Sequence, residues 1–434
     1  MNRWKRILSA LRAEDTDAIS EEGDRRVAEN LAIWRGRPPW LGKTGGRTLH
    51  LGRTVCREAA RTVCSELTVR AEDAWLDRQM NRFLPHFPEI VSAACGVGQC
   101  MIRLYPAKGG VYAEAVLPDR YAVLARDASG RARHVCFFEE CREGDNCYLR
   151  REEHQMSDDG LYRITSRVYL IEDGTVIREV PMASVAHFAP YPEQVTIGGV
   201  TDGFFAEWRM DASDGGMVGC PIWGSAISLM EDADRQYERL LWEFEGGELA
   251  VDVGEDAFQM SKDGLPIIPE GRDRLFRLSA LDGQGDGTPL FQVFSPALRD
   301  ESLIRGLNRI LMFFEDAVGM ARGTVSDPDV AAKTATEVRA SKQRTYLTVM
   351  QIRRQAEQVL RAIAKGMWQM GRLYRMCSAR EMAICIRFGD SVLNDGENER
   401  TADRADFAAG LMTKEEYRAK WIAGEDTAER RWRT

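Results

Sequence analysis

Apolar residues recur at helical spacing in several long stretches of the chain. Residues 1–35 predict an amphipathic helix that ends before two prolines, and residues 47–84 predict one or two further helices. The capping box Thr334-x-x-Glu337 opens the longest helical run, which extends to about Arg375 and would be about 60 Å long. A second capping box, which begins at Thr413, predicts a final helix near the end of the chain.

Two strongly amphipathic helices are predicted on either side of a short region of strands. Residues 221–248 place apolar side chains at steps of three and four, and residues 299–320 do the same. Between them, residues 249–297 contain three short apolar runs joined by connections rich in Gly, Asp and Pro. This order predicts a small β module between two long helices.

A different period governs residues 110–190, where short apolar runs are separated by turn sequences such as Asp127-Ala-Ser-Gly130. We therefore predict a mostly antiparallel β region here. Residues 192–220 are rich in Gly and Asp and predict a loop, whereas residues 381–388 predict one more strand. Because helices and antiparallel strands occupy different parts of the chain, the predicted fold class is α+β.

Composition and charge exclude several classes of protein. The 434 residues are 44% hydrophobic and 29% charged, which is typical of a globular chain of about three domains. The net charge of −8 argues against a protein that simply coats duplex DNA. The chain has no apolar run of about 18 residues and no signal peptide at its start, so we expect no membrane contact and synthesis in the cytoplasm.

The common catalytic and metal-binding motifs are incomplete or missing. Gly42-Lys43-Thr44 lacks the earlier glycine of a phosphate-binding loop, and Gly96-Val-Gly98 lacks the third glycine and the helix of a dinucleotide site. The five histidines are scattered, and the ten cysteines contain no C-x-x-C pair, so we predict buried thiols in a reducing compartment, with a metal or redox site as the alternative. A nuclease site made of carboxylates alone stays open. We expect no catalytic residue, no metal and no cofactor.

The long helices carry opposite charges. Residues 221–248 contain seven acidic and two basic residues, for a net charge of −5, whereas residues 333–375 contain ten basic and two acidic residues, for +8. A single pair of these helices cannot bury all of its apolar side chains or pair all of its charges. Packing against copies of the same chain in a closed ring would achieve both.

The order of elements resembles that of phage portal proteins, specifically the A118-like family within the SPP1-type portals. The stretches that carry the resemblance are Lys333-Thr-Ala-Thr-Glu-Val338, Phe388-Gly-Asp-Ser-Val392 with the acidic run after it, and Ala409-Gly-Leu-Met-Thr-Lys-Glu-Glu-Tyr-Arg418 with Trp421. The resemblance extends over residues 40–425 and implies the portal fold, a ring of about twelve copies at one capsid vertex.

The resemblance also divides the chain into parts. It implies an N-terminal region and wing (1–220), a first stem helix (221–248), a clip (249–298), a second stem helix (299–320), a tunnel loop (321–333), a long wing or crown helix (334–375), and a C-terminal wing strand with a small crown (376–434).

Within this scheme, the residues expected to face DNA are Arg322, Thr324, Ser326, Lys333, Glu231, Asp234 and Glu238. An acidic stem helix would repel the DNA backbone and keep the duplex centred, while weak loop contacts would let it slide. The alternative is that the stem acids pair with bases on the neighbouring subunit. The clip residues expected to bind the motor or connector are Asp263, Arg272, Arg274 and Asp282.

The resemblance implies a virion protein assembled in the host cytoplasm and without enzymatic activity. Its implied partners are further copies of itself, double-stranded DNA bound without sequence specificity, the terminase large subunit, the major capsid and scaffolding proteins, and a head–tail adaptor. The alternatives are a nucleic-acid hydrolase and another connector or hub protein of the virion.

Overall fold

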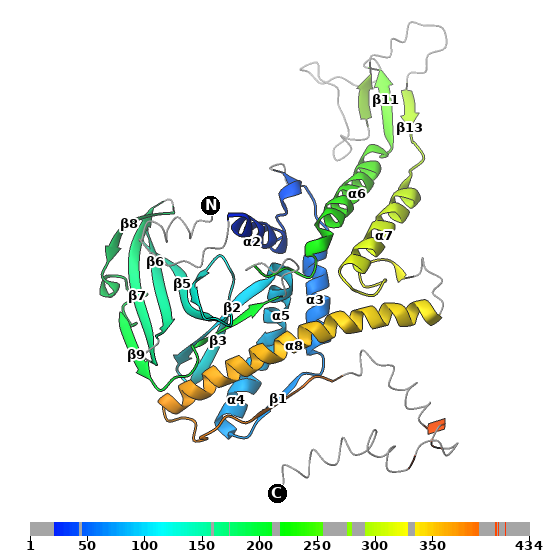
Figure 1. Ribbon diagram of the computed structural model, residues 1–434. Helices are drawn as coiled ribbons and strands as arrows, with labels where there is room; N and C mark the ends of the chain where they lie inside the picture. Colours follow the sequence, from blue (N-terminus) through cyan, green and yellow to red (C-terminus); the bar gives the residue numbers. More distant parts are fainter. Residues whose placement is uncertain are drawn as a thin grey trace, which may run out of the picture. The chain divides into compact units, whose positions relative to one another are not determined.

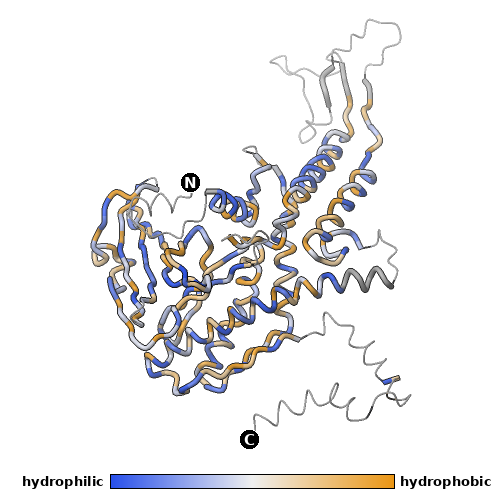
Figure 2. The backbone as a smooth tube through the Cα atoms, in the orientation of Figure 1, coloured by the Kyte–Doolittle hydropathy of each residue, from blue (hydrophilic) through white to orange (hydrophobic). Residues whose placement is uncertain are grey.

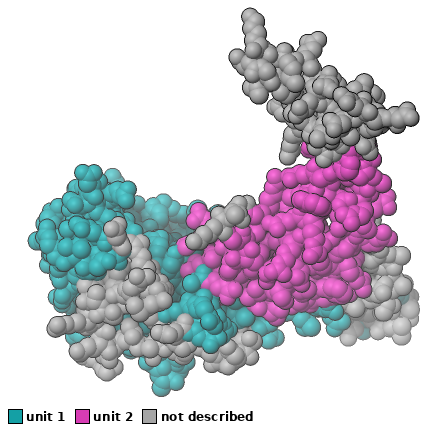
Figure 3. Space-filling view, turned by 90° about the horizontal axis from the view of Figure 1, so that it is seen from above, with its two compact units in different colours: residues 1–28, 56–221, 334–434 teal, residues 29–55, 222–333 magenta. Residues whose placement is uncertain are grey.

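The computed structural model describes residues 21–42, 46–157, 160–172, 174–210, 218–254, 276–279, 291–328 and 335–389, and the single residues 404, 405, 407 and 413 (Figure 1). The chain divides into two compact units. Unit 1 contains residues 1–28, 56–221 and 334–434, and unit 2 contains residues 29–55 and 222–333 (Figure 3). The described residues contain helices and largely antiparallel sheets, so the mixed α and β composition predicted from the sequence is confirmed.

The main sheet of unit 1 is built from strands that follow one another along the chain. They are β4 (Tyr121–Arg126), β5 (Ala132–Glu143), β6 (Asn146–Met156), β7 (Leu161–Glu172) and β8 (Thr175–Val180), all antiparallel to their neighbours. The turn between β4 and β5 forms as predicted, because the Asp127 carboxylate accepts hydrogen bonds from the backbone N–H groups of Ser129 and Arg131. Two apolar clusters on this sheet centre on Phe137 and Phe138.

The predicted loop at 192–220 is wrong in part, because it contains two strands. β9 (Gln194–Gly198) extends the main sheet by pairing with β7, and β10 (Phe205–Arg209) pairs with β2 (Gln99–Ala107). β2 also pairs with β3 (Gly110–Val116) to complete a second sheet. Ala206 and Trp208 of β10 are buried, so pairing and burial outweigh the loop-like composition around these short strands.

Helices precede and flank the second sheet. The described chain begins with α2 (Glu21–Trp34), and the predicted helices of 47–84 are α3 (Leu51–Cys64) and α4 (Ala74–Phe83), with the short strand β1 (Thr68–Ala71) between them. α5 (Phe87–Val97) begins just after Pro85 and carries Pro88 in its first turn, where a helix tolerates proline.

The longest predicted helix is confirmed as α8 (Ala335–Leu373), which packs against α4, β2, β3 and β10 in unit 1. α8 runs without interruption through Gly366 and Gly371, where glycine would also permit a bend. Both glycines instead allow close approach: a Cβ atom at Gly366 would lie 2.3 Å from Leu104 Cδ1, and one at Gly371 would lie 2.3 Å from Trp75 Cζ3. After α8, the predicted strand at 381–388 is shorter and forms as β14 (Ile384–Arg387), paired with β1.

Unit 2 is organised around a pair of long helices. α6 (Ile227–Gly246) and α7 (Asp300–Ala317) lie within the two helical ranges predicted from the sequence. Both helices carry hydrophilic and hydrophobic residues along their length (Figure 2). Between them, β11 (Ala250–Gly254) pairs with β12 (Phe276–Ser279) in parallel and with β13 (Phe291–Phe294) in antiparallel orientation. The three predicted strands of the small β module are therefore confirmed.

Candidate nucleic-acid interface

The helices α6 and α7 form an antiparallel hairpin whose two ends are fixed by polar contacts. Near the β module, the Arg299 guanidinium donates to the Glu243 carboxylate at 2.6 Å, and the Arg299 backbone N–H donates to the same group at 3.0 Å. These hydrogen bonds lower the pKa of the Glu243 carboxyl below its ordinary value. At the opposite end, the Ser225 hydroxyl donates to the Ala317 carbonyl at 3.4 Å. The hairpin is thus closed at both ends.

Asp234, predicted to face DNA, is instead buried inside unit 2. Only 3% of this residue is exposed. Its carboxylate accepts hydrogen bonds from Trp40 Nε1 at 2.9 Å and from the Leu49 backbone N–H at 2.8 Å. The sequence places Asp234 on α6 but does not show that Trp40 and Leu49 cover that side of the helix. Asp234 therefore anchors these two residues to α6, and the prediction that it faces DNA is wrong.

The other two predicted acids of the stem lie nearer to solvent. Glu231 forms an ion pair with Arg235, one turn further along α6, at 2.5 Å. Glu238 is exposed and, with Arg235, Arg239 and Trp242, lines a surface hollow of about 280 Å³. Basic side chains therefore accompany both acids, and the outer surface of α6 is less negative than its six acidic and two basic residues indicate.

The segment that follows α7 is held by one buried carboxylate. Glu315 has 0% exposure, and its carboxylate accepts hydrogen bonds from the backbone N–H groups of Gly323, Val325 and Ser326 at 3.2, 2.6 and 2.9 Å. The Ser326 hydroxyl donates to the same carboxylate at 2.7 Å. Asn308, also buried on α7, accepts from the Asp327 backbone N–H at 2.7 Å. Residues 323–327 are therefore wrapped around side chains of α7.

These contacts change the roles of the predicted loop residues. Ser326 is 5% exposed and bonded to Glu315, so the prediction that it faces DNA is wrong. Arg322 remains partly exposed but forms an ion pair with Asp316 at 2.6 Å, and the Thr324 hydroxyl donates to the Ala321 carbonyl. Lys333 lies outside the described residues, as do the four clip residues Asp263, Arg272, Arg274 and Asp282.

The outer surface of the hairpin carries large apolar side chains that sequence reasoning missed. Trp242 is 67% exposed on α6, and Ile304 and Phe313 are 48% and 45% exposed on α7. The Arg309 guanidinium lies 5.0 Å from the centre of the Phe313 ring. The sequence contains a signal for this exposure. Trp242 follows Leu241 and Phe313 precedes Phe314. Adjacent positions point to different sides of a helix, so the two apolar residues of such a pair do not both face the same core.

Much of the predicted basic charge of α8 is engaged within unit 1. Arg353 is 3% exposed and donates to the Gly389 carbonyl at 2.7 Å, while Lys365 forms an ion pair with Asp202. Arg361 pairs with Glu357 on the same helix at 2.7 Å. The basic character of α8 therefore contributes to the stability of unit 1 and leaves fewer charges for other partners.

A buried cluster of charged residues on the main sheet of unit 1 also has a structural role. Glu152 lies 2.8 Å from His154 Nε2, 3.1 Å from Arg103 and 3.2 Å from Arg150. Burial by itself would raise the pKa of Glu152, but the hydrogen bond with His154 and the charges of Arg150 and Arg103 lower it to about 2. Glu152 thus joins His154, Arg103 and Arg150 through one buried carboxylate.

Glu152→Gln is expected to lower the free energy of unfolding by about 3 kcal/mol at neutral pH. Because the pKa of folded Glu152 lies below the ordinary value of 4.5, its stabilising contribution is complete above pH 4.5. That contribution is lost as the pH falls toward 2, so the two proteins should converge there. Urea unfolding across this range measures the difference. Glu179→Gln removes an exposed ion pair and should differ from the wild type by less than about 1 kcal/mol, and a pH-independent cost of Glu152→Gln would contradict the prediction.

The described residues offer little for metal or thiol chemistry. Among them, no group of three or more His, Cys, Asp or Glu side chains is placed to hold a metal ion. The ten cysteines all lie in described residues and form no disulfide there, and burial raises the pKa of Cys64 and Cys100 to about 12. Within the part of the chain that the structure describes, no helix has the length and apolar character needed to cross a membrane.

The described elements comprise a unit of helices and antiparallel sheets that includes the long helix α8, and a unit built on a helical hairpin with a small sheet. No family model and no curated protein matches the chain. Among solved structures, it is similar to a chain in the virion of the native gene transfer agent (GTA) particle, at 10% identity and a TM-score of 0.48, over 96% of this chain and 97% of that one. It is also similar to a chain in the neck of the native GTA particle computed with C12 symmetry, at 11% identity and 0.49, over 95% and 97%.

A third similar chain belongs to the neck of the empty GTA particle computed with C6 symmetry, at 12% identity and a TM-score of 0.45, over 90% of this chain and 92% of that one. All three TM-scores lie below 0.5, so the likeness is a loose one. None of these three chains is described as an A118-like portal, and that assignment stays a prediction.

Proposed function

We propose that the chain is a structural subunit of a phage-type head or neck, and specifically a portal protein. In this proposal about twelve copies form a ring at one capsid vertex, and double-stranded DNA passes through the ring during packaging and ejection. The chain has no catalytic role in this scheme. The observation that carries the proposal is the set of exposed apolar side chains on both helices of the α6–α7 hairpin.

The hairpin is suited to packing side by side with copies of itself. Trp242, Ile304 and Phe313 are each nearly half exposed or more. Single exposed apolar residues are ordinary, but several large ones on one narrow two-helix element mark an interaction surface. A closed ring would bury this surface on every copy, because each hairpin has a neighbour on both sides.

The charges of the hairpin and loop fit a partner that slides. Many strong contacts between basic residues and phosphates would hold DNA in place, and their strength would depend on salt. Arg322 is already paired with Asp316, and Thr324 with its own loop, so each can offer DNA only a weak contact. Glu231 and Glu238 near the outer surface of α6 either repel the DNA backbone or pair with a neighbouring copy.

The remaining partners follow from the resemblance to portals. The clip at residues 249–298 would bind the terminase large subunit during packaging and a head–tail adaptor afterwards. The wing in unit 1 would contact the major capsid and scaffolding proteins. A head–tail connector or hub of another kind would also form a ring but would not bind the packaging motor. If the chain is a portal, it should bind the motor, and deletion of residues 249–298 should abolish that binding.

Mass measurement of the purified chain tests the proposal directly. We expect a species near twelve times 48.9 kDa by mass photometry, and electron microscopy of that species should show a central opening wide enough for duplex DNA. A compact monomer, or an oligomer without an opening, would contradict the proposal. Cleavage of DNA that depends on added Mg²⁺ or Mn²⁺ would favour the alternative of a nucleic-acid hydrolase.

A further inference from the structure

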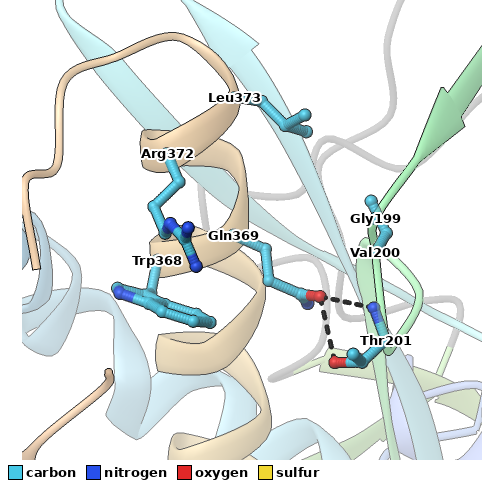
Figure 4. Close-up of a pocket in the computed structure, with 7 residues that line it drawn as sticks. All are labelled: Gly199, Val200, Thr201, Trp368, Gln369, Arg372 and Leu373. Atoms are coloured by element: carbon cyan, nitrogen blue, oxygen red, sulfur yellow. Dashed lines mark hydrogen bonds between the residues drawn. The ribbon is translucent and has the colours of Figure 1, made fainter. Parts of the chain in front are cut away.

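A pocket in unit 1 lies where the last turns of α8 meet the chain between β9 and β10 (Figure 4). It has a volume of about 290 Å³ and is lined by Gly199, Val200, Thr201, Trp368, Gln369, Arg372 and Leu373. Pockets for small molecules begin at about 300 Å³, so this one has room for one or two side chains of a partner rather than for a cofactor.

Two side chains of the pocket wall are fixed by hydrogen bonds. Gln369 is 6% exposed, and its carboxamide oxygen accepts from the Thr201 backbone N–H at 2.7 Å and from the Thr201 hydroxyl at 3.2 Å (Figure 4). The Trp368 indole donates to the Ala379 carbonyl at 3.1 Å, and the Arg372 guanidinium lies 5.0 Å from the centre of its ring. The wall is therefore set before any partner binds, which lowers the entropic cost of binding.

Apolar side chains continue the pocket onto the surface. Leu373 is 43% exposed, Tyr374 57% and Met376 38%. We call the surface formed by Trp368, Arg372, Leu373, Tyr374, Arg375 and Met376 the α8 end patch. It combines apolar surface with arginines at 372 and 375, and a third arginine, Arg380, follows at an exposed position.

Arg375 occupies a backbone conformation that favours glycine. Its φ is +56°, and the Met376 N–H donates to the Gly371 carbonyl at 2.7 Å, as expected where the residue after a helix end is left-handed. Glycine adopts this conformation at lower energy than any residue with a Cβ atom. A residue other than glycine in this conformation, at an exposed apolar patch, is a reason to look for a role of its side chain in binding.

We propose that the α8 end patch binds an acidic peptide segment of another protein, with an apolar side chain of that peptide in the pocket and its carboxylates beside Arg372 and Arg375. The charge of the patch is complementary to such a peptide. Duplex DNA fits less well, because it presents phosphates to a protein surface but no apolar side chain that would fill the pocket. This inference is independent of the proposed portal function.

The test uses the full-length chain and a set of fluorescein-labelled hexapeptides, Asp-Glu-x-x-Glu-Asp, in which x is Phe, Leu, Ile or Trp. Fluorescence anisotropy should detect binding by at least one of them. The matched peptide with serine at x should bind at least about tenfold more weakly, since it lacks the apolar anchor. Failure of every acidic apolar peptide to bind would overturn the proposal.

Variants separate a binding role from a structural one. Arg375→Gly should raise the melting temperature, because it relieves the left-handed residue, and yet weaken peptide binding about threefold or more. Arg372→Glu should weaken binding about tenfold, whereas Arg361→Glu, a charge reversal elsewhere on exposed α8, should leave it within about twofold. If Arg375→Gly stabilises the chain without weakening binding, Arg375 has no part in the site and the proposal fails.

Two further measurements address other occupants. A labelled duplex oligonucleotide that binds more tightly than the peptides, and loses affinity in Arg372→Glu, would assign the patch to nucleic acid and overturn the proposal. The other candidate occupant of the patch is the acidic run of the same chain. A variant with Asp390 and Asp395 replaced by Asn, and Glu397 and Glu399 replaced by Gln, tests whether this run competes with the peptides. If it binds the peptides about tenfold more tightly than the wild type, that run is the natural occupant and the proposal is wrong.

Discussion

Glu315→Ala is expected to lower the free energy of unfolding by about 4 kcal/mol and to release the segment after α7. The variant removes the acceptor of three backbone N–H groups and one hydroxyl, all near a carboxylate with no exposure. A buried donor left without its acceptor costs about 1–3 kcal/mol, and partial relaxation of the segment offsets some of the total. Urea unfolding measures the loss, and hydrogen exchange at residues 323–326 should report that these amides lose protection first.

Matched variants give this prediction its control. Asp316→Ala, at the next position of α7, removes the partly exposed ion pair with Arg322 and should cost less than about 1 kcal/mol. Glu315→Gln keeps one oxygen acceptor and should lie between Glu315→Ala and the wild type. If the amides of 323–326 exchange at the same rate in Glu315→Ala as in the wild type, Glu315 does not hold the segment.

In the proposed ring, this local result has a functional consequence. The segment held by Glu315 and Asn308 belongs to the tunnel loop (321–333) of that proposal. Two side chains of α7 set the shape of residues 323–327, so this shape does not require contacts with DNA. Glu315→Ala is therefore expected to release residues 323–327 from α7 without changing their sequence.

The double variant Trp242→Glu/Phe313→Glu is expected to abolish assembly of the ring. Both side chains are exposed within the chain, at 67% and 45%, so their replacement should leave the fold of the single chain intact. Loss of a buried aromatic at an interface costs about 2 kcal/mol or more, which is at least about a thirtyfold loss of affinity. Because every contact in a ring carries the same change, mass photometry at micromolar concentration should show single chains only.

The control for this variant is Ile177→Glu, which changes an apolar residue of β8 that is 49% exposed in unit 1. It should leave the mass of the assembly unchanged. Circular dichroism and the melting temperature should show that all three proteins are folded. A Trp242→Glu/Phe313→Glu protein that still forms the full ring would show that the outer surface of the hairpin is not the contact between copies.

Long periodic elements were predictable because their signal is local. α6, α7 and α8 each repeat apolar residues over many turns, and glycine or a capping box marks their ends, so their positions follow from the sequence to within a few residues. The strands β4 to β8 were predictable for the same reason, since each is separated from the next by a recognisable turn.

Short elements defined by distant partners were not predictable. β9 and β10 have five residues each and lie among glycines and aspartates. Their strand character comes from pairing with β7 and β2, which are separated from them by intervening chain. Composition describes only the neighbours in sequence, so it favoured a loop where the sheet supplied the hydrogen bonds.

The candidate site shows the same division at the level of single side chains. From the sequence alone come the α+β class, the amphipathic hairpin with its small β module, the long basic helix, and the positions of Asp234 in the first helix of the hairpin and of Ser326 in the segment after the second. Only the tertiary structure shows that Trp40 and Leu49 bury Asp234, that Glu315 captures Ser326, and that Trp242 and Phe313 stay exposed. Periodicity gives the side of a helix on which a residue lies, but which segment covers that side depends on contacts between residues far apart in the chain.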